Sequence, residues 1–411
     1  MLKYSKYIRD SINGNLPITN LENEIMDYPQ FQRLRRVKQL GFTSLIYPGA
    51  NHTRFEHCIG TMHLGGKLAE SLELTDDEIQ LVRLAGLLHD IGHGPFSHLS
   101  ESVIGVKHEK FTEFIIKNTA VSTKLSENYN LDKICDIING KGKLGPLISG
   151  ELDVDRMDYL MRDSHYTGVN YGVIDADRLI ANLKLEKYLV LDIKGVQAAE
   201  SMLLARYFMY PSVYQHHTAR IIDAMFRHAL DQMIEKEDLN TRKLFFLDDN
   251  ELINKCKNST TESTRNMIER IENRQLLKVI NTIGLNNFTK PNDVFKINIG
   301  DIIKAEHEIA EDYNIDKNYV FISLPEYPKF DEMKTQIAIG DDLYNLNEVS
   351  SIVQALNKAR FNYPDIALYS LNEHADILKK VDISNYLELP EISEKTLNKT
   401  HFDQIDLLEY M

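Results

Sequence analysis

The segment HDIGHGPFSH, residues 89–98, places three histidines and one aspartate within ten residues. Apolar residues precede it at helical spacing, and Thr75 with Glu78 is the pattern of a capping box that begins a helix. The glycine at the fourth position of the segment is expected to end that helix. The sequence therefore predicts that His89 and Asp90 lie in the last turn of this helix.

His89 and Asp90 have the chemistry of metal ligands. Neutral imidazole and carboxylate are favoured by zinc, manganese and iron, but two adjacent ligands do not complete a coordination shell. His57, in the stretch NHTRFEH, and Asp155, in the stretch ELDVDRMDY, are candidates for the remaining positions. For an isolated His-Asp dipeptide a purely structural pair is the alternative. The four residues together predict a metal site assembled from three helices.

This order of residues, with the motifs around it, resembles the HD-domain metallophosphohydrolase superfamily. Within it, the chain looks like the deoxynucleoside triphosphate triphosphohydrolases, which include the animal enzyme that joins a sterile alpha motif to an HD domain and the bacterial dGTPases. The resemblance covers roughly residues 1–235 and becomes weak beyond them. Its motifs are DYPQFQRLRRVKQLG (27–41), YPGA (47–50), RFEH (54–57), GPFSH (94–98), DVDRMDY (153–159) and YQH (214–216).

The resemblance and the hydrophobic pattern together predict the architecture. We expect a mainly α protein, with an all-helical HD-domain core and a short N-terminal arm or hairpin over residues 1–235. A smaller α+β C-terminal lobe, with an oligomerisation or regulatory role, is expected over residues 236–411. A helix is expected from about Pro211 onward. Strands are indicated at 188–196, 319–324 and 335–339, and a further helix near 348–359.

The resemblance also implies a reaction. The family motif places the metal on His57, His89, Asp90 and Asp155. That metal would activate water or orient the α-phosphate of a deoxynucleoside triphosphate, which is cleaved to deoxynucleoside and triphosphate. A magnesium ion is expected to accompany the substrate phosphates. The ligand types suit iron, manganese or zinc and do not distinguish among them.

One helical face carries three candidate site residues. Asp155, Tyr159 and Asp163 fall at positions i, i+4 and i+8, so one face can hold a metal at one end and recognise a hydroxyl at the other. The alternative is a solvated polar face. By resemblance, Gln39 and Leu40 meet the sugar and base opposite Asp163. The alternative is that Gln32, Gln39 and the neighbouring arginines cap and brace one helix.

Three arginines are the candidates for binding the triphosphate. Guanidinium groups match phosphate oxygens bidentately, and we expect Arg54, Arg156 and Arg206 around the phosphates. Arg54 could instead pair with Glu56 or Asp27. Arg206 lies at helical spacing from Tyr210 and Tyr214. By resemblance Tyr214 lies against the sugar, whereas ordinary packing of the tyrosines is the alternative.

Several histidines lie beyond the four-ligand set. The resemblance places His93, His98 and His108 in the catalytic cleft, where an imidazole can protonate the departing nucleoside oxygen because its pKa lies near working pH. Their alternative role is to brace the loop. The remaining candidates, His52, His63 and His165, are interpreted as structural or surface residues.

A regulatory site is implied by the same resemblance. Asp27, Gln32 and Arg35 match residues that recognise a guanine activator in related enzymes, and Lys6 and Lys194 lie near phosphate-binding positions. We therefore expect a nucleotide activator of altered specificity and a homo-oligomer, either a dimer or a tetramer. The pocket departs from the family pattern at Arg9, Ser11, Asn13 and Asp192.

Composition limits the possible partners. The 411 residues carry 47 basic and 61 acidic side chains, giving a net charge of −14. This balance disfavours general nucleic-acid binding but allows an anionic substrate in a local basic pocket. No apolar run is long enough to cross a membrane and no signal peptide is evident, so we expect a cytoplasmic protein without a membrane partner. We interpret Cys58 as a buried free thiol.

Two other functions remain open at this point. The residues that would bind the base cannot be identified from the sequence. The same metal motif therefore also fits an HD phosphohydrolase that acts on other ribo- or deoxynucleotides, or on nucleoside diphosphates. A nucleotide-sensing binding protein with secondary or lost activity is the second alternative, and the presence of all four expected ligands disfavours it.

Overall fold

The helix before the histidine-rich segment has the predicted start and a slightly earlier end. In the computed structural model, which describes residues 2–327 and 335–393, α4 spans Asp76–Leu88 and begins with the capping box of Thr75 and Glu78. His89 caps its C-terminal end, so His89 and Asp90 follow the last turn instead of lying in it. Both residues are thereby carried by the loop at the end of the helix.

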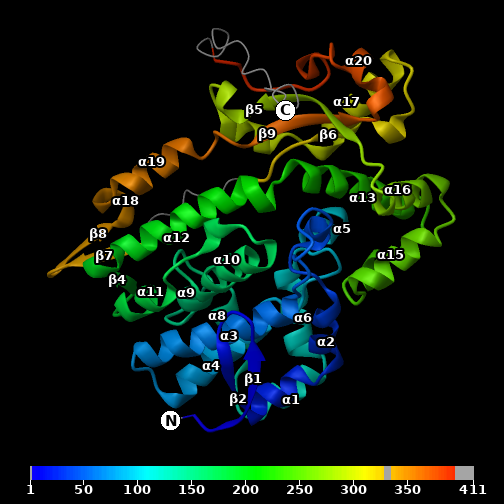
Figure 1. Cartoon of the computed structure of the whole chain (residues 1–411). Coiled ribbons are helices and arrows are strands. Elements are labelled where there is room, and N and C mark those ends of the chain that lie inside the picture. Colours follow the sequence, from blue (N-terminus) through cyan, green and yellow to red (C-terminus); the bar gives the residue numbers. More distant parts are fainter. Residues whose placement is uncertain (1, 328–334, 394–411) are drawn as a thin grey trace. The chain divides into compact units, whose positions relative to one another are not determined.

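Close packing of two helices positions the metal-site candidates. α3 (Arg54–Ser71) packs along α4, and a Cβ atom added at Gly86 of α4 would lie 3.0 Å from the backbone nitrogen of Met62 in α3. Only glycine allows the two backbones to approach this closely. The two helices lie side by side (Figure 1), and their approach brings His57, in the first turn of α3, towards the loop that follows α4.

The described residues divide into two units, of which the first contains residues 2–275 and 335–358. It is mainly helical, as expected. Strands β1 (Tyr4–Asp10) and β2 (Gly14–Thr19) form an antiparallel N-terminal hairpin. Besides α3 and α4, the α-helices between this hairpin and residue 182 are α1 (Asn20–Met26), α2 (Pro29–Gln32), α5 (His98–Ile104), α6 (His108–Asn118), α7 (Ala120–Ser126), α8 (Leu131–Ile138), α9 (Gly145–Ile148), α10 (Val154–Thr167) and α11 (Ala176–Asn182).

The helix expected from Pro211 begins later than predicted. α12 (Val196–Met209) runs into a π-helical turn, Tyr210–Tyr214, and α13 (His217–Glu235) starts after it. Proline lacks a backbone N–H and interrupts regular helical hydrogen bonding, which accounts for the wide turn at Pro211. The turn therefore changes the spacing of the tyrosines from that of a continuous helix.

The first unit extends beyond the predicted domain boundary after residue 235. Helices α14 (Thr241–Leu244), α15 (Asp249–Lys257) and α16 (Glu262–Glu272) belong to it. Contacts hold α16 to α13, among them a 3.0 Å hydrogen bond from Thr264 Oγ1 to the carbonyl of Ala229. The first unit therefore continues past the change in composition at residue 235, because the apolar faces of α13 and α16 pack together.

A small mixed sheet joins distant parts of the sequence within the first unit. Its order is β3-β4-β7-β8, and β7 (Gln336–Ile339) pairs in parallel with β4 (Leu189–Asp192). The predicted strands at 188–196 and 335–339 are therefore neighbours in one sheet. Its other strands are β3 (Leu183–Leu185) and β8 (Asp342–Asn345), followed by helices α18 (Leu346–Val349) and α19 (Ser351–Ala359).

The second unit is the smaller α+β part of the chain. Among the described residues it contains 276–327 and 359–393, and its antiparallel sheet has the order β5-β9-β6. Buried Ile309 and Val320 lie in one apolar cluster with Ile366 and Leu368 of the central strand. Its elements are β5 (Lys278–Gly284), α17 (Ile299–Asp312), β6 (Phe321–Ser323), β9 (Asp365–Ser370) and α20 (Ala375–Leu378).

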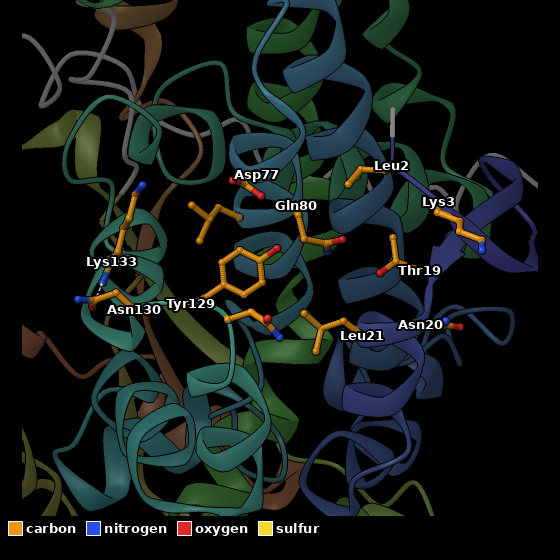
Figure 2. A pocket seen from close by; sticks show the side chains of 12 residues that line it. Leu2, Lys3, Thr19, Asn20, Leu21, Asp77, Gln80, Tyr129, Asn130 and Lys133 are labelled. Atoms are coloured by element: carbon orange, nitrogen blue, oxygen red, sulfur yellow. Dashed lines mark hydrogen bonds between the residues drawn. The ribbon is translucent and has the colours of Figure 1, made fainter.

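Three further observations bear on the sequence-based expectations. Cys58 is a fully buried free thiol, as predicted. Among the described residues, every helix is too short or too polar to cross a membrane. A surface pocket of about 650 Å³ lies beside α4 (Figure 2), and its buried polar side chains, Thr19 and Gln80, form hydrogen bonds within the protein. This pocket therefore shows no buried polar group directed at a ligand.

Candidate metal centre and active site

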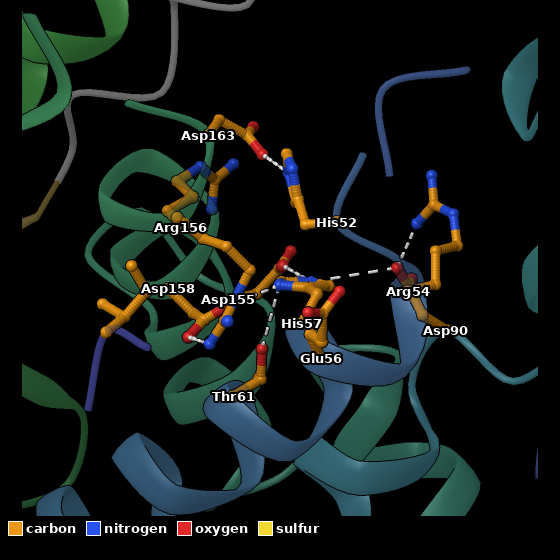
Figure 3. A network of polar contacts seen from close by, with 12 residues as sticks. His52, Arg54, Glu56, His57, Thr61, Asp90, Asp155, Arg156, Asp158 and Asp163 are labelled. Atoms are coloured by element: carbon orange, nitrogen blue, oxygen red, sulfur yellow. Dashed lines mark hydrogen bonds and ion pairs between the residues drawn. The ribbon is translucent and has the colours of Figure 1, made fainter. Parts of the chain in front are cut away.

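Four predicted ligands converge between α3, the end of α4 and the first turn of α10. His57 Nε2 lies 3.2 Å from His89 Nε2 and 3.0 Å from Asp155 Oδ1. The carboxylate of Asp90 lies 3.4 Å from His89 Nε2 and 3.8 Å from His57 Nε2. His57, His89 and Asp90 are buried (Figure 3 shows His57 with the two aspartates).

The Nδ1 atoms of His57 and His89 each contact an oxygen acceptor, an arrangement that is suited to metal binding through Nε2. His57 Nδ1 lies 2.9 Å from Asp158 Oδ2, and His89 Nδ1 lies 2.8 Å from the carbonyl of Gly86. These acceptors favour a proton on each Nδ1, which leaves the two Nε2 atoms facing each other as acceptors. Burial disfavours a charged imidazole, yet Asp155 and Asp158 raise the pKa of His57 to about 10. The cluster therefore favours positive charge where the Nε2 atoms meet.

Asp158 supports the centre and was not among the predicted site residues. It is buried and accepts hydrogen bonds from Arg162, which in turn donates to Asp10. Its place one turn after Asp155 in the DVDRMDY motif was the available signal. A Cβ at Gly60 would lie 2.0 Å from Asp158 Oδ1, so glycine allows the carboxylate to reach α3.

We expect Asp158→Ala to weaken metal affinity about tenfold to a hundredfold, which is the usual effect of losing an outer partner of a ligating histidine. Asp158→Asn retains an oxygen acceptor for His57 Nδ1 and should lose less. Metal content after titration with a chelator measures the effect. Equal affinity in the wild type and the alanine variant would contradict the orienting role.

Arg54 pairs with neither Glu56 nor Asp27, the two alternative partners considered from the sequence. It is buried at the start of α3, where Nη1 pairs with Asp90 and Nε donates to Ser97 Oγ at 2.7 Å. Glu56 instead completes the capping box with Thr53. Arg54 therefore lies beside a candidate metal ligand.

The other two arginines have different surroundings. Arg156 pairs through Nη1 with Asp153 and the carbonyl of Gly150, at the loop before α10. Burial raises the pKa values of Tyr159 and Tyr214, and the positive charge of Arg206 opposes this rise, so Arg206 lies near both phenols. Arg206 is therefore close to two of the residues that were predicted to bind the substrate.

A buried network occupies the predicted sugar-recognition region. Asp163 Oδ1 lies 2.7 Å from His52 Nε2, and Tyr214 donates its hydroxyl to Asp163 Oδ2 at 3.0 Å. The rings of Tyr159 and Tyr214 are 6.0 Å apart, in an edge-to-face arrangement. His52 was interpreted as a structural or surface residue, and its buried contact with Asp163 connects it to the candidate site.

The segment before α3 contributes a polar atom without a partner. Gln39 donates its backbone N–H to the carbonyl of His52 at 3.0 Å, which places it next to the Asp163 network. Its side-chain Oε1 is buried and has no hydrogen-bond partner among the described residues. Leu40 precedes the 3₁₀ turn Gly41–Leu45. A buried acceptor of this kind fits a ligand-facing role for Gln39.

The three additional histidines converge on one carboxylate, Glu101, which was not predicted. Glu101 Oε1 lies 2.8 Å from His108 Nδ1, 3.2 Å from His93 Nδ1 and 3.3 Å from His98 Nδ1. Although burial acts in the opposite direction, these histidines hold the pKa of Glu101 well below its usual range. His93 also approaches Asp90, at 3.3 Å, so this cluster adjoins the metal-site candidates.

The histidines differ in exposure. His93 is buried, which lowers its pKa to about 3, whereas the side chain of His98 is 65% exposed. His108 begins α6, as expected from the sequence. Because an acid must reach the substrate, His98 is the best placed of the three to meet a bound molecule.

The predicted regulatory residues lie on several elements. Gln32 donates to the carbonyl of Met26 at 2.7 Å and accepts from Arg35 Nε at 2.9 Å. Asp27 caps the end of α1, so these three residues are close in the chain and in space. Lys6 lies on β1 and Lys194 in the turn before α12.

Comparisons with known proteins agree with this arrangement. Residues 54–163 match the HD domain, and residues 174–398 match the HD associated region. An uncharacterized protein from Methanocaldococcus jannaschii is 35% identical over 98% of this chain and 87% of its own length. The deoxynucleoside triphosphate triphosphohydrolase SAMHD1 homolog of Dictyostelium discoideum is 34% identical, over 68% of this chain and 61% of its own length.

Solved structures show the same fold. A hypothetical protein from Aquifex aeolicus superposes with a TM-score of 0.75 and 30% identity, covering 91% of this chain and 98% of its own. A phosphohydrolase from Bacteroides thetaiotaomicron gives a TM-score of 0.74 and 28% identity, covering 90% and 100%. The chain therefore belongs to the HD-domain phosphohydrolase family and carries the HD-associated region, with SAMHD1-like proteins among its homologues.

Proposed function

We propose that this protein is a metal-dependent deoxynucleoside triphosphate triphosphohydrolase. The observation that carries the proposal is the convergence of His57, His89, Asp90 and Asp155, with both histidine Nε2 atoms facing each other and both Nδ1 atoms bonded outward. The names of homologues such as the Dictyostelium triphosphohydrolase supply the substrate class. The family itself supports only the coarser activity of a phosphohydrolase.

The residues present fit a divalent transition metal. His57, His89, Asp90 and Asp155 would hold it, and it would supply Lewis acidity to water or to the α-phosphate. Asp158 keeps the proton of His57 on Nδ1 and so orients Nε2 inward. We retain iron, manganese and zinc as the candidates, and magnesium as the ion that accompanies the substrate phosphates.

The protein's own groups can assist departure of the nucleoside. Glu101 accepts from the Nδ1 side of His98 and stabilises the charged imidazolium, whose proton is delivered to the 5′-oxygen as the phosphorus–oxygen bond breaks. His93 and His108 hold Glu101 in place. We place Arg206 on the phosphates, while Arg54 and Arg156 add positive charge beside Asp90 and Asp153.

The sugar is read at the opposite end of the same α10 face. We assign recognition of the 3′-hydroxyl to Asp163, which His52 and Tyr214 hold in place. Tyr214 covers the 2′ position, Gln39 and Leu40 contribute from the facing segment, and Tyr159 and Tyr210 complete the wall. Because these groups are buried or half-buried, an unmatched sugar hydroxyl would lose its hydrogen bonds to water.

A substrate screen with purified, metal-loaded protein tests the proposal. Each dNTP, NTP and NDP is supplied alone and in pairs, and products are separated by ion-exchange chromatography. Deoxynucleoside plus intact triphosphate is the expected result. Preferred hydrolysis of ribonucleotides or diphosphates would favour the alternative HD phosphohydrolase. Binding without turnover under every metal would favour the nucleotide-sensing protein.

We also propose a homo-oligomer, dimeric or tetrameric, with an activating nucleotide bound near Asp27, Gln32 and Arg35. The contact between Gln32 and Arg35 keeps two of these polar groups together. Addition of GTP or dGTP is expected to raise the rate on a second dNTP several-fold and to shift the mass measured by light scattering. A monomer whose rate is indifferent to any second nucleotide would contradict both parts.

A further inference from the structure

We propose that Asp249, the first residue of α15, is a positioning residue that fixes both sides of the active site. The residue is only 6% exposed, although aspartate side chains are ordinarily charged at neutral pH and lie at the surface. Its two oxygens accept from two separate backbone amides, Phe96 N at 2.8 Å and Lys38 N at 2.9 Å. One side chain thus joins two segments that lie far apart in the sequence.

The backbone amides of Lys38 and Phe96 each lie within two residues of a side chain that is proposed to act on the substrate. Lys38 precedes Gln39, whose buried Oε1 has no hydrogen-bond partner among the described residues. Phe96 lies two residues before His98, the proposed acid. Displacement of the Asp249 carboxylate would therefore move the sugar side and the acid side of the site together.

Asp249 contacts a turn whose backbone conformation is unfavourable for the residues that form it. Phe96 and Ser97 have φ angles of +52° and +50°, in the left-handed region that residues with a Cβ atom rarely adopt. Ser97 Oγ accepts from Arg54, and Arg54 pairs with Asp90. The conformation of this turn is thereby connected to a candidate metal ligand, and the hydrogen bond that Asp249 accepts from the Phe96 N–H helps to hold it.

A second side chain ties the same two regions together. Arg33 is buried and donates through Nη2 to the carbonyls of Ile91 and His93, at 3.1 and 2.6 Å. Its Nη1 donates to the carbonyl of Leu247 at 3.0 Å, two residues before Asp249. Through Arg33 the segment at the start of α15 is connected to Ile91 and His93, and through Asp249 it is connected to Phe96.

Capping of α15 does not explain Asp249. That role belongs to Asp248, whose Oδ1 accepts from Glu251 N at 3.0 Å in a complete capping box. Asp249 directs its oxygens away from its own helix, towards Phe96 and Lys38. Its bonds therefore serve the loop and the recognition segment.

Asp249→Asn is the direct test because it preserves shape but places an N–H₂ group against one of two N–H donors. Asp238→Asn is the matched control, since Asp238 accepts from Thr260 N at 2.9 Å and Ser259 Oγ at 2.6 Å without touching the site residues. Metal content, kcat, KM and hydrogen–deuterium exchange of the peptide covering residues 94–100 are measured for both.

For Asp249→Asn we expect unchanged metal content, a kcat about tenfold to a hundredfold lower and faster exchange of that peptide, since small displacements of catalytic groups have effects of this size. The control should match the wild type in all three. Wild-type kcat and exchange in Asp249→Asn would overturn the proposal. If that variant does not fold, Asp249→Glu replaces it, because its displaced oxygens must also lower kcat, and a wild-type kcat there is likewise contradictory.

The kinetic part of this inference rests on the proposed function, whereas the exchange measurement does not. If the wild type hydrolyses no nucleotide, the proposed function fails. Exchange at residues 94–100 then still decides whether Asp249 holds the loop.

Discussion

Replacing Asp90 by alanine is expected to remove the bound metal and to lower hydrolysis by more than about a hundredfold, while helical content stays unchanged. Losing only an outer partner of a ligand costs about ten- to a hundredfold, and Asp90 is itself a proposed ligand. The substitution also deprives Arg54 of its ion pair, which leaves a buried guanidinium beside the centre. Elemental analysis, circular dichroism and turnover are measured on the same preparation.

His89→Ala should behave in the same way, since both residues come from the loop after α4. Asp77→Ala is the control, because Asp77 is exposed at the other end of that helix. Full metal occupancy and surviving turnover in purified Asp90→Ala would show that the site is misassigned.

The second large effect concerns the choice of sugar. Tyr214 is proposed to lie against C2′, where a ribonucleotide hydroxyl would be buried without a partner. Such burial costs roughly 1–3 kcal/mol, which is about tenfold to a hundredfold in relative rate. Wild-type protein should therefore prefer dGTP to GTP and dATP to ATP, and Tyr214→Ala should narrow both preferences.

Tyr214→Phe separates the ring from the hydroxyl. Phenylalanine keeps the aromatic ring but loses the 3.0 Å hydrogen bond to Asp163. If the ring is the barrier, this variant keeps sugar discrimination although its overall rate falls. The measurement is kcat/KM for the two nucleotide pairs in all three proteins. Equal hydrolysis of both sugars by the wild type, or full discrimination by Tyr214→Ala, would remove Tyr214 from this role.

The metal-site candidates could be predicted from the sequence because each lies in a short motif near a helix end. His89 and Asp90 follow a helix with a clear capping box, and His57 and Asp155 occupy the first turns of their own helices. Local pattern and family resemblance point to the same four residues. Their convergence follows from helix packing, which depends on the close approach of α3 and α4 at Gly86, and the sequence pattern did not indicate this approach.

The residues that support the site were less visible, since a supporting role depends on contacts between distant segments. Glu101 and Asp158 lie one turn from predicted residues, so helical spacing could have found them. Asp249 lies 153 positions from Phe96, and its neighbours Asp248 and Glu251 read as an ordinary helix cap. Nothing local in the sequence indicates its inward direction.

The differences in the fold have a similar origin. The pattern after Pro211 is helical, but the proline introduces a π-helical turn, so α13 begins at His217. Composition changes after residue 235, yet Thr264 and its helix pack on α13 within the first unit. Local preferences located the elements, whereas tertiary packing determined where the units divide.

The position of bond cleavage tests the central claim most directly. The preferred dNTP is hydrolysed in water enriched in oxygen-18, and the products are analysed by mass spectrometry. Attack at the α-phosphorus predicts an unlabelled deoxynucleoside and an intact triphosphate carrying one oxygen-18 atom. Release of orthophosphate or pyrophosphate, or label in the deoxynucleoside, would contradict the account.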